Sequence, residues 1–255
     1  PGANGNIGAA DGKGAAPDGH VVLFTGAGTM ATNLALYKNL PFHPQKDFEP
    51  VIVVGNVPNI LVVHPSIPVN NVKEFVEYVK KNPGANFGTT GNGSSMHTAA
   101  ELFRQSTQTI MTHVPFNGAG PATTSLLSGE VPIMFQLVPG IATHVKANKV
   151  KALAVMAPKR SVALPDVPTM AEAGFPKIES TTWLCFAAPK GTPKAVVDSL
   201  NGAVNKILAQ PAFRERLAGM GVEPMGGTPA EFATFLDAEI KKWGAVVRGA
   251  GVVIE

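Results

Sequence analysis

The stretch FGTTGNGSSMHTAAELF, from Phe87 to Phe103, reads as the end of a strand, a loop with two glycines and two serines, and then a helix. Glycine lets a backbone approach a ligand closely, and the free N–H groups at a helix start carry partial positive charge. Together these features attract anions. The stretch therefore predicts an anion-binding loop over Thr90, Gly91, Asn92, Gly93, Ser94 and Ser95.

Two other loops have the same design. Residues 25–29 (TGAGT) follow the run VVLF, and residues 117–121 (NGAGP) follow the run VPF. The separations between the three loops are unequal, so they do not form a solenoid repeat. They are typical of one local solution used again at the carboxyl ends of strands in an α/β fold, where ligands tend to bind.

The rest of the chain supports an α/β fold class. β-branched runs alternate with amphipathic segments, a pattern that predicts parallel sheets flanked by helices. The expected strands begin at Val21, Val51, Asn59, Ile110, Val131, Lys151 and Thr181, and the expected helices between them begin at Val72, Met96 and Gly120. Beyond residue 193 the pattern is almost entirely helical, with Pro193, Pro211 and Pro229 at the expected helix starts.

The spacing of the glycines and of the residues after them argues against a nucleotide as the anion that this loop binds. GNGSSM lacks the third glycine of the dinucleotide-binding fingerprint, no acidic residue follows about twenty positions later, and no G-K-[ST] is present. A carboxylate fits better, because a few N–H groups and the hydroxyls of Ser94 and Ser95 can hold it. A purely structural interpretation stays open, since glycine-rich turns and serine N-caps are common connectors.

Composition excludes several other classes. The 255 residues are 45% hydrophobic and 15% charged with a net charge of +3, which indicates a folded globular protein without a basic stripe for nucleic acid. The most apolar stretch, Val51 to Val63, is shorter than the roughly 20 residues of a membrane helix.

Cys185 lies in an apolar run and is expected to be buried. The opening PGANGNIGAADGKGAAPDGH reads as turn chemistry, without a signal peptide.

No catalytic or metal-binding constellation stands out. Ser94 and His97 are near each other, but no carboxylate is marked to orient the histidine and the sequence does not match G-x-S-x-G. The histidines have no metal-ligand spacing. No cofactor is expected. The acids considered as acid–base pairs are expected to serve solvation or capping: Asp47, Glu49, Glu101 and Glu130.

Motifs from end to end resemble the Bug-type periplasmic solute-binding proteins, the receptor class of tripartite tricarboxylate transporters. The motifs are PGANGNIGA, APDG, DFEPV, GTTGNGSSMHTAAELF, VPFNGAGPATTSLLSGEVPIMF, KVKALAVMAPKRSVALPDVPTMAEAGFP and WLCFAAPKGTP. The resemblance implies a two-domain periplasmic-binding-protein-like fold of type II, with two crossing strands and a carboxylate in the cleft. The expected domains are residues 1–62 with 187–255, and residues 63–186.

The resemblance also implies a set of ligand-binding residues. The loop from Thr90 to Ser95, with His97 in the helix behind it, would hold the carboxylate in the second domain. The other expected ligand-binding residues are Thr25, Thr29, Met30, Phe116, Asn117, Gly118 and Gln136. The residues themselves leave other roles open, because Met30 and Phe116 also suit a core and Thr25 a helix cap.

Departures from the family pattern narrow the ligand. Phe116, Asn117 and Gly118 stand where members often have Tyr-Lys-Gly, and Gln136 stands where an Asp is frequent. The missing acid argues against a ligand ammonium group, and the missing Lys argues against a tricarboxylate. We expect a small mono- or dicarboxylate, aliphatic or aromatic. Family members usually begin with a further strand, loop and helix, so this sequence reads as cut at its front.

The mechanism implied is closure around a ligand without chemistry, after which a membrane permease recognises the closed form. The expected protein is a periplasmic monomer, exported by a signal peptide that this sequence lacks. Two alternatives remain. One is a solute-binding sensor or interaction protein, and the other is an enzyme that uses His97 or Ser94 on a bound acid.

Overall fold

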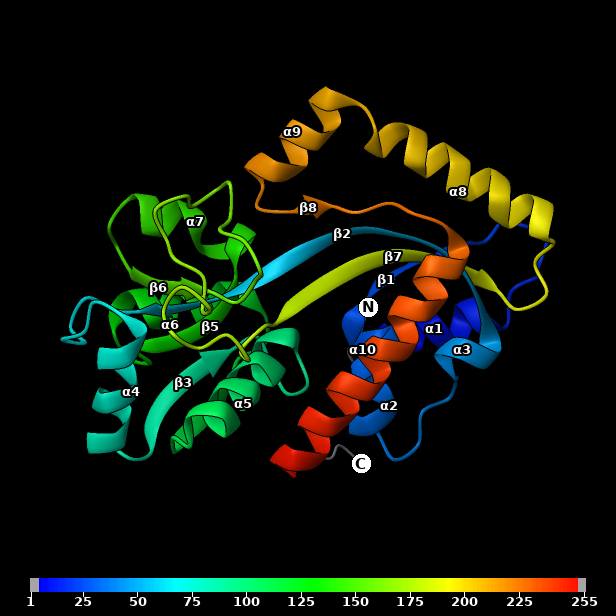
Figure 1. Cartoon of the computed structure of the whole chain (residues 1–255). Coiled ribbons are helices and arrows are strands. Elements are labelled where there is room, and N and C mark those ends of the chain that lie inside the picture. The colour runs from blue at the N-terminus through cyan, green and yellow to red at the C-terminus, as the bar shows by residue number, and fades with distance from the viewer. Residues whose placement is uncertain (1–4, 252–255) are drawn as a thin grey trace. The chain divides into compact units, whose positions relative to one another are not determined.

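The computed structural model describes residues 5–251 and divides the chain into two compact units (Figure 1). Of the described residues, unit 1 comprises 5–56, 182–217 and 223–251, and unit 2 comprises 57–181 and 218–222. The chain passes from unit 1 to unit 2 within β2 (Phe48–Val63), and it returns at the start of β7 (Thr181–Pro189). The sequence therefore supplies strands, not loops, at both of these transitions.

Unit 2 is built on a mixed sheet. Its strands are β3 (Ala85–Thr89), β4 (Met111–Pro115), β5 (Ile133–Leu137), β6 (Lys151–Val155) and the second part of β2. β3 pairs in parallel with both β4 and β5, whereas β2 pairs antiparallel with β5 on one side and β6 on the other. Because β3, β4 and β5 run in the same direction, the loops that follow them emerge at one edge of the sheet.

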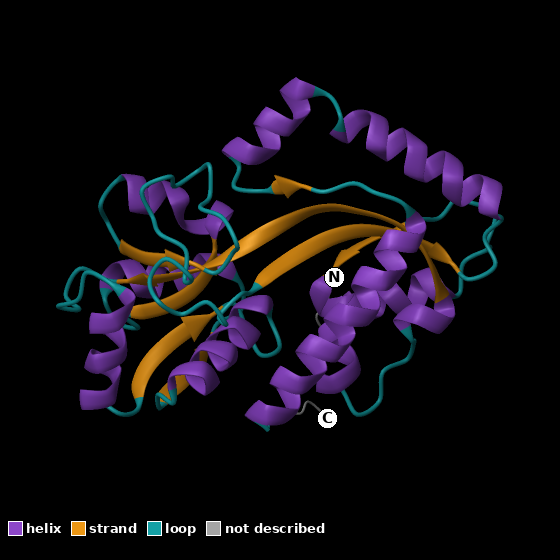
Figure 2. Cartoon of the chain, viewed as in Figure 1, coloured by secondary structure: helices purple, strands orange, loops and turns teal. Residues whose placement is uncertain are grey.

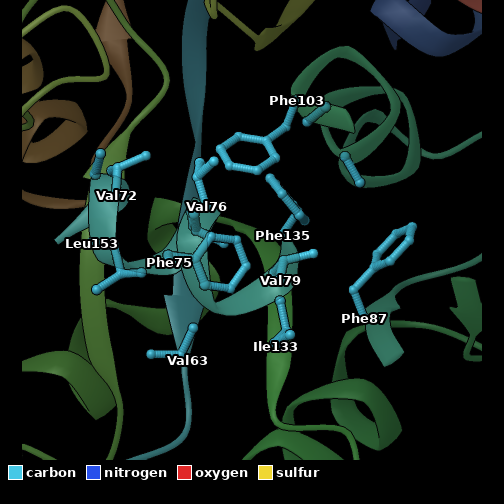
Figure 3. Packing of buried hydrophobic residues seen from close by; sticks show 14 of the residues in the cluster. Val63, Val72, Phe75, Val76, Val79, Phe87, Phe103, Ile133, Phe135 and Leu153 are labelled. Atoms are coloured by element: carbon cyan, nitrogen blue, oxygen red, sulfur yellow. The ribbon is translucent and has the colours of Figure 1, made fainter. Parts of the chain in front are cut away.

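Helices cover both faces of the unit 2 sheet (Figure 2). They are α4 (Val72–Lys81), α5 (Ser95–Thr107), α6 (Ala119–Ser128) and α7 (Val138–Lys146). Phe75 of α4, Phe103 of α5 and Phe135 of β5 belong to the core on one face (Figure 3). Leu126 of α6 and Ile141 of α7 belong to the core on the other. Alternate residues of β5 enter these two cores, as the two-residue period of a strand requires.

The sequence explains the helix that starts at Val72. Val72, Phe75, Val76 and Val79 are buried and recur every three or four residues, which gives α4 one apolar face. Asn71 caps the helix, since its side chain accepts a hydrogen bond of 2.9 Å from the Glu74 N–H. The sequence pattern therefore predicts both the start and the buried face of α4.

The expectation of separate strands beginning at Val51 and Asn59 is wrong. The structure has one 16-residue strand, β2. The backbone of Gly55 and Asn56 pairs with β8 (Glu223–Pro224), and the Asn59 side chain donates a 3.0 Å hydrogen bond to Ser180 Oγ. The Oδ1 atoms of Asn56 and Asn59 are buried without a hydrogen-bond partner among the described residues. Because the backbone is paired and the Asn59 N–H group has an acceptor, the chain continues as one strand through this polar run.

Unit 1 holds the remaining elements. These are α1 (Asn6–Lys13), β1 (Leu23–Gly26), the π-helical segment η2 (Gly28–Thr32), α2 (Asn33–Leu36), α3 (Pro44–Asp47), α8 (Lys194–Leu208), α9 (Pro211–Gly219, whose last two residues belong to unit 2) and α10 (Pro229–Ala250). β7 lies between β1 and β2, and β1 pairs with it antiparallel. Pro193 is the N-cap of α8, and Pro211 and Pro229 begin α9 and α10, which confirms the three expected helix starts.

The sequence predicts turns at the start of the chain, and this prediction is wrong for residues 6–13. Residues 1–4 of the same stretch lie outside the described residues. Residues 6–13 form α1. Asn6, Ala9 and Gly12 are buried, and the Asn6 Oδ1 accepts a 2.6 Å hydrogen bond from Asn33 Nδ2. Small side chains let this helix pack closely against its neighbours. Its content of Gly and Asn predicts turns, but tertiary contacts stabilise it as a helix.

A buried acid joins two elements of unit 1. Oε2 of Glu239 in α10 accepts hydrogen bonds from the indole N–H of Trp183 in β7, at 2.9 Å, and of Trp243, at 2.8 Å. All three side chains are buried. Within residues 5–251 no helix is long and apolar enough to cross a membrane.

Candidate functional site

The Thr90–Ser95 loop lies where the sequence places a strand-to-helix connection. β3 ends at Thr89 and α5 begins at Ser95. Ser94 is the N-cap of α5, and its Oγ accepts a 3.2 Å hydrogen bond from the His97 N–H. The loop is thus held at the positive end of a 13-residue helix.

Two hydroxyl groups of this loop have the Met96 sulfur, a weak hydrogen-bond acceptor, as their partner in the described part of the chain. Thr90 Oγ1 lies 3.7 Å and Ser95 Oγ 3.3 Å from the sulfur of Met96. A thioether sulfur accepts hydrogen bonds weakly. Both hydroxyls can therefore turn to a stronger acceptor, such as a carboxylate oxygen.

Both loop glycines have positive φ angles and donate hydrogen bonds inside unit 2. Gly91 has φ 132° and its N–H donates to Thr89 Oγ1 at 3.2 Å. Gly93 has φ 73° and its N–H donates to His97 Nδ1 at 3.1 Å. Residues other than glycine rarely adopt these conformations, so the shape of the loop depends on both positions.

The loop of Phe116, Asn117 and Gly118 lies beside the Thr90–Ser95 loop. It connects β4 to α6, and the Phe116 N–H donates a 3.0 Å hydrogen bond to the Thr89 carbonyl. The Phe116 ring packs over Gly88, where an added Cβ would lie 3.3 Å from the ring. Asn117 is exposed and Gly118 has φ 103°. The structure therefore brings these two predicted loops together.

Gln136 is buried in β5, near the same edge of the sheet. Its Oε1 accepts a 2.9 Å hydrogen bond from the Leu137 N–H, and its Nε2 has the Met134 sulfur at 4.0 Å. In the described part of the chain Nε2 therefore has only this weak partner, and the side chain packs against Gly140 of α7.

The remaining expected residues lie in unit 1. Thr25 is in β1, opposite Cys185 of β7. Thr29 and Met30 lie in η2 and are buried, with the Thr29 hydroxyl directed at Gly5, the residue before α1. Met30 is only 1% exposed, so it is part of the unit 1 core in this structure.

A cluster that the sequence did not reveal lies behind the Thr90–Ser95 loop. His97 stacks on His113 of β4 with ring centroids 3.9 Å apart and an angle of 13° between the rings. His113 Nε2 lies 2.6 Å from Thr89 Oγ1. The expectation that Glu101 serves solvation or capping is wrong, because Glu101 is buried, 3.8 Å from His97 Nε2 and paired with Arg104 at 2.6 Å.

The contact between His97 and Glu101 could have been predicted from the sequence. His97 and Glu101 are four residues apart, which places them on one face of a helix. The contact of His113 with His97 could not have been, because only the parallel pairing of β3 with β4 brings His113 to this place. Among the described residues, no group of three or more His, Cys, Asp or Glu side chains could hold a metal ion.

Burial lowers the pKa of both histidines. The pKa of His97 falls from 6.5 to about 3, through burial first and then the charges of His113 and Arg104. The pKa of His113 falls to about 4 for the same first reason, with Arg104 adding to it. Both imidazoles are therefore neutral at neutral pH.

We expect the stability of the protein to fall as the pH is lowered from about 7 to 5. Below pH 6.5 the unfolded chain binds protons on these two histidines, whereas the folded chain resists protonation until far lower pH. Each histidine should then lose about 1–2 kcal/mol of stabilisation over this range. Thermal unfolding at a series of pH values measures this loss.

Two variants separate the contribution of His97 from that of other groups. His97→Asn removes one titrating ring and should make the loss between pH 7 and 5 smaller than in the wild type. His20→Gln, at an exposed histidine, should follow the wild-type curve. Parallel curves for the wild type and His97→Asn would contradict the expectation.

The sequence and the fold of this chain have clear counterparts among known proteins. Residues 1–252 match the tripartite tricarboxylate transporter family receptor. The chain is 33% identical over 256 residues to Protein BugT of Bordetella pertussis, which covers 100% of this chain and 78% of that protein. It is 35% identical over 254 residues to the UPF0065 protein in the TAR-I ttuE-ttuC' intergenic region of Agrobacterium vitis, covering 98% of this chain and 73% of that protein.

Solved structures agree. "R. palustris Rpa4515 with adipate" superposes with a TM-score of 0.91 at 35% identity, covering 99% of this chain and 85% of that chain. "MatC (Rpa3494) from Rhodopseudomonas palustris with bound malate" gives a TM-score of 0.85 at 34% identity, covering 96% and 85%.

The α/β architecture is that of the periplasmic binding proteins, as the sequence predicts. The chain belongs to the tripartite tricarboxylate transporter receptor family. Receptors of this family are periplasmic, bind small carboxylates and work with membrane transporters. The family and these structural neighbours are solute-binding receptors, not enzymes.

Proposed function

We propose that this protein is a receptor that captures a small mono- or dicarboxylate without chemical change and delivers it to the membrane permease of a tripartite transporter. It acts as a monomer in the periplasm. In unit 2 the ligand is held by the Thr90–Ser95 loop and Phe116–Gly118, with Gln136 near them. Thr25, Thr29 and Met30 of unit 1 stay predicted ligand contacts, although the Met30 side chain lies in the unit 1 core. The proposed domains are residues 1–62 with 187–255, and residues 63–186, which differ from the two compact units by a few residues at each transition and by residues 218–222.

The Thr90–Ser95 loop is the observation that carries the proposal. It combines a helix start with the hydroxyls of Thr90 and Ser95, whose one partner among residues 5–251 is a thioether sulfur. An oxygen ligand with negative charge suits both features. The relatives with adipate and malate support a carboxylate of this size.

The ligand's second end is expected to be neutral or anionic. Gln136 provides an amide where an acid would be needed to pair with an ammonium group. Phe116 packs beside the loop and offers an apolar surface to an aliphatic or aromatic ligand.

A melting-temperature screen against mono- and dicarboxylates, including adipate and malate, tests the proposal. A ligand at about 100 times its Kd should add roughly 2.7 kcal/mol, which corresponds to about 5–10 °C for a chain of this size. Adipamide is the matched control, because it keeps the length of adipate but lacks its charges, and it should give no shift. No shift with any carboxylate would contradict the proposal.

Recovery of the ligand separates a receptor from an enzyme. After incubation with the protein, the bound acid should be recovered unchanged and in stoichiometric amount. Turnover of the acid would show that the protein is an enzyme, and His97 and Ser94 would then be the first residues to replace.

A further inference from the structure

Both glycines of the Thr90–Ser95 loop are connected to a histidine, and the two histidines contact each other. Gly93 donates its N–H directly to His97 Nδ1 at 3.1 Å. Gly91 donates its N–H to Thr89 Oγ1, which lies 2.6 Å from His113 Nε2. The two rings are stacked 3.9 Å apart, so the two connections form one unit behind the loop.

The Gly93 contact works with only one form of His97. Nδ1 accepts a hydrogen bond only when it carries no proton, so the ring proton must lie on Nε2. Nε2 faces Glu101 Oε1 at 3.8 Å, an acceptor that Arg104 holds in place at 2.6 Å. A proton on Nδ1 would place two donors, the Gly93 N–H and the His97 Nδ1–H, opposite each other, and the hydrogen bond from Gly93 would break.

The surroundings of the pair favour this neutral form. The charged and titratable groups that face His97 are Glu101 and Arg104 of its own helix and His113 of β4. His97 is 5% exposed, and Phe87 also stacks on His113 with centroids 5.1 Å apart. A second positive charge on rings this close would be repelled by the first.

We propose that His97 and His113 are positioning residues, which hold Gly93 and Gly91 so that the Thr90–Ser95 loop keeps the shape that receives the ligand. This inference rests on the proposed function and deepens it. In it, His97 acts through the Gly93 amide and not through the ligand. His97 is thus assigned a different role from the ligand contact expected from the sequence.

Amide hydrogen exchange and ligand affinity together test the proposal. His97→Ala removes the acceptor, so exchange of the Gly93 amide should become at least tenfold faster and the Kd for adipate and for malate at least tenfold higher. His97→Asn is the rescue variant, because its side-chain oxygen can take the position of Nδ1 and accept from Gly93. It should bring both quantities back to within about threefold of the wild type.

His64→Ala is the matched control. His64 lies in unit 2, but within residues 5–251 its side chain forms hydrogen bonds only with Ser66. This variant should leave Gly93 exchange and both Kd values unchanged. Thermal unfolding of each variant identifies any that fail to fold, and His97→Asn then decides the question alone.

The outcomes separate this proposal from the proposed function. If neither adipate nor malate nor any other carboxylate binds the wild type, the proposed function fails, and the Gly93 exchange rates still decide the role of His97. Unchanged Gly93 exchange in His97→Ala would overturn the positioning role. Loss of affinity in both His97 variants, with Gly93 protected in His97→Asn, would also overturn it, since His97 would then contact the ligand.

Discussion

Replacing Glu239 by leucine is expected to destabilise the protein by about 3–5 kcal/mol, the largest effect that we predict. Glu239 Oε2 accepts both indole N–H groups, from Trp183 and Trp243, and both rings are about 1% exposed or less. Leucine fills a similar volume but leaves two buried donors without partners, at about 1–3 kcal/mol each. The melting temperature should fall by roughly 10 °C.

Two further variants isolate the hydrogen bonds as the cause. Glu239→Gln keeps one oxygen that can accept both indoles, so its loss should be less than half that of Glu239→Leu. Asp237→Asn changes an acid on the same helix that is half exposed and paired with Lys241, and should cost less than about 1 kcal/mol. Equal losses for the leucine and glutamine variants would contradict this explanation.

Replacing Gly91 by alanine is expected to weaken carboxylate binding by roughly a hundredfold, about 2.7 kcal/mol. Gly91 has φ 132°, a conformation that costs residues with a Cβ about 1–3 kcal/mol. An added Cβ would also meet the Phe116 carbonyl oxygen at 3.4 Å. The loop should therefore change shape while the core beneath it stays folded. Calorimetric titration with adipate and malate measures the change in Kd.

Gly120→Ala is the control for this change. Gly120 lies in α6 next to the Phe116–Gly118 loop, and an added Cβ there meets no atom within 4 Å. This variant should bind as the wild type does. Wild-type affinity in Gly91→Ala would mean that the loop's conformation does not matter for binding.

The sequence could predict most of the fold, because local patterns govern most of its elements. α4 has a capping residue and a regular apolar face, and Pro211 and Pro229 mark helix starts that the structure confirms. Local patterns fail where distant contacts decide. The Asn59 amide donates to Ser180, and Asn6 accepts from Asn33, so one continuous strand forms where two were expected and a helix forms where turns were expected.

The candidate site divides in the same way. The Thr90–Ser95 loop could be located because its glycines and capping serine are adjacent in the sequence. His113 could not, because it reaches His97 only through the pairing of β4 with β3. The internal use of the Gly91 and Gly93 amides also depends on side chains outside the loop or at its edge.

The antiparallel pairing of β2 has a consequence for the order of folding. Ile60 pairs with Gln136 on one side and with Val155 on the other. In unit 1, Thr25 pairs with Cys185. Pairings between such remote residues require large loops to close first, which slows folding. A nascent chain can complete neither sheet until most of its length has been synthesised, so both sheets must form late in synthesis or after it.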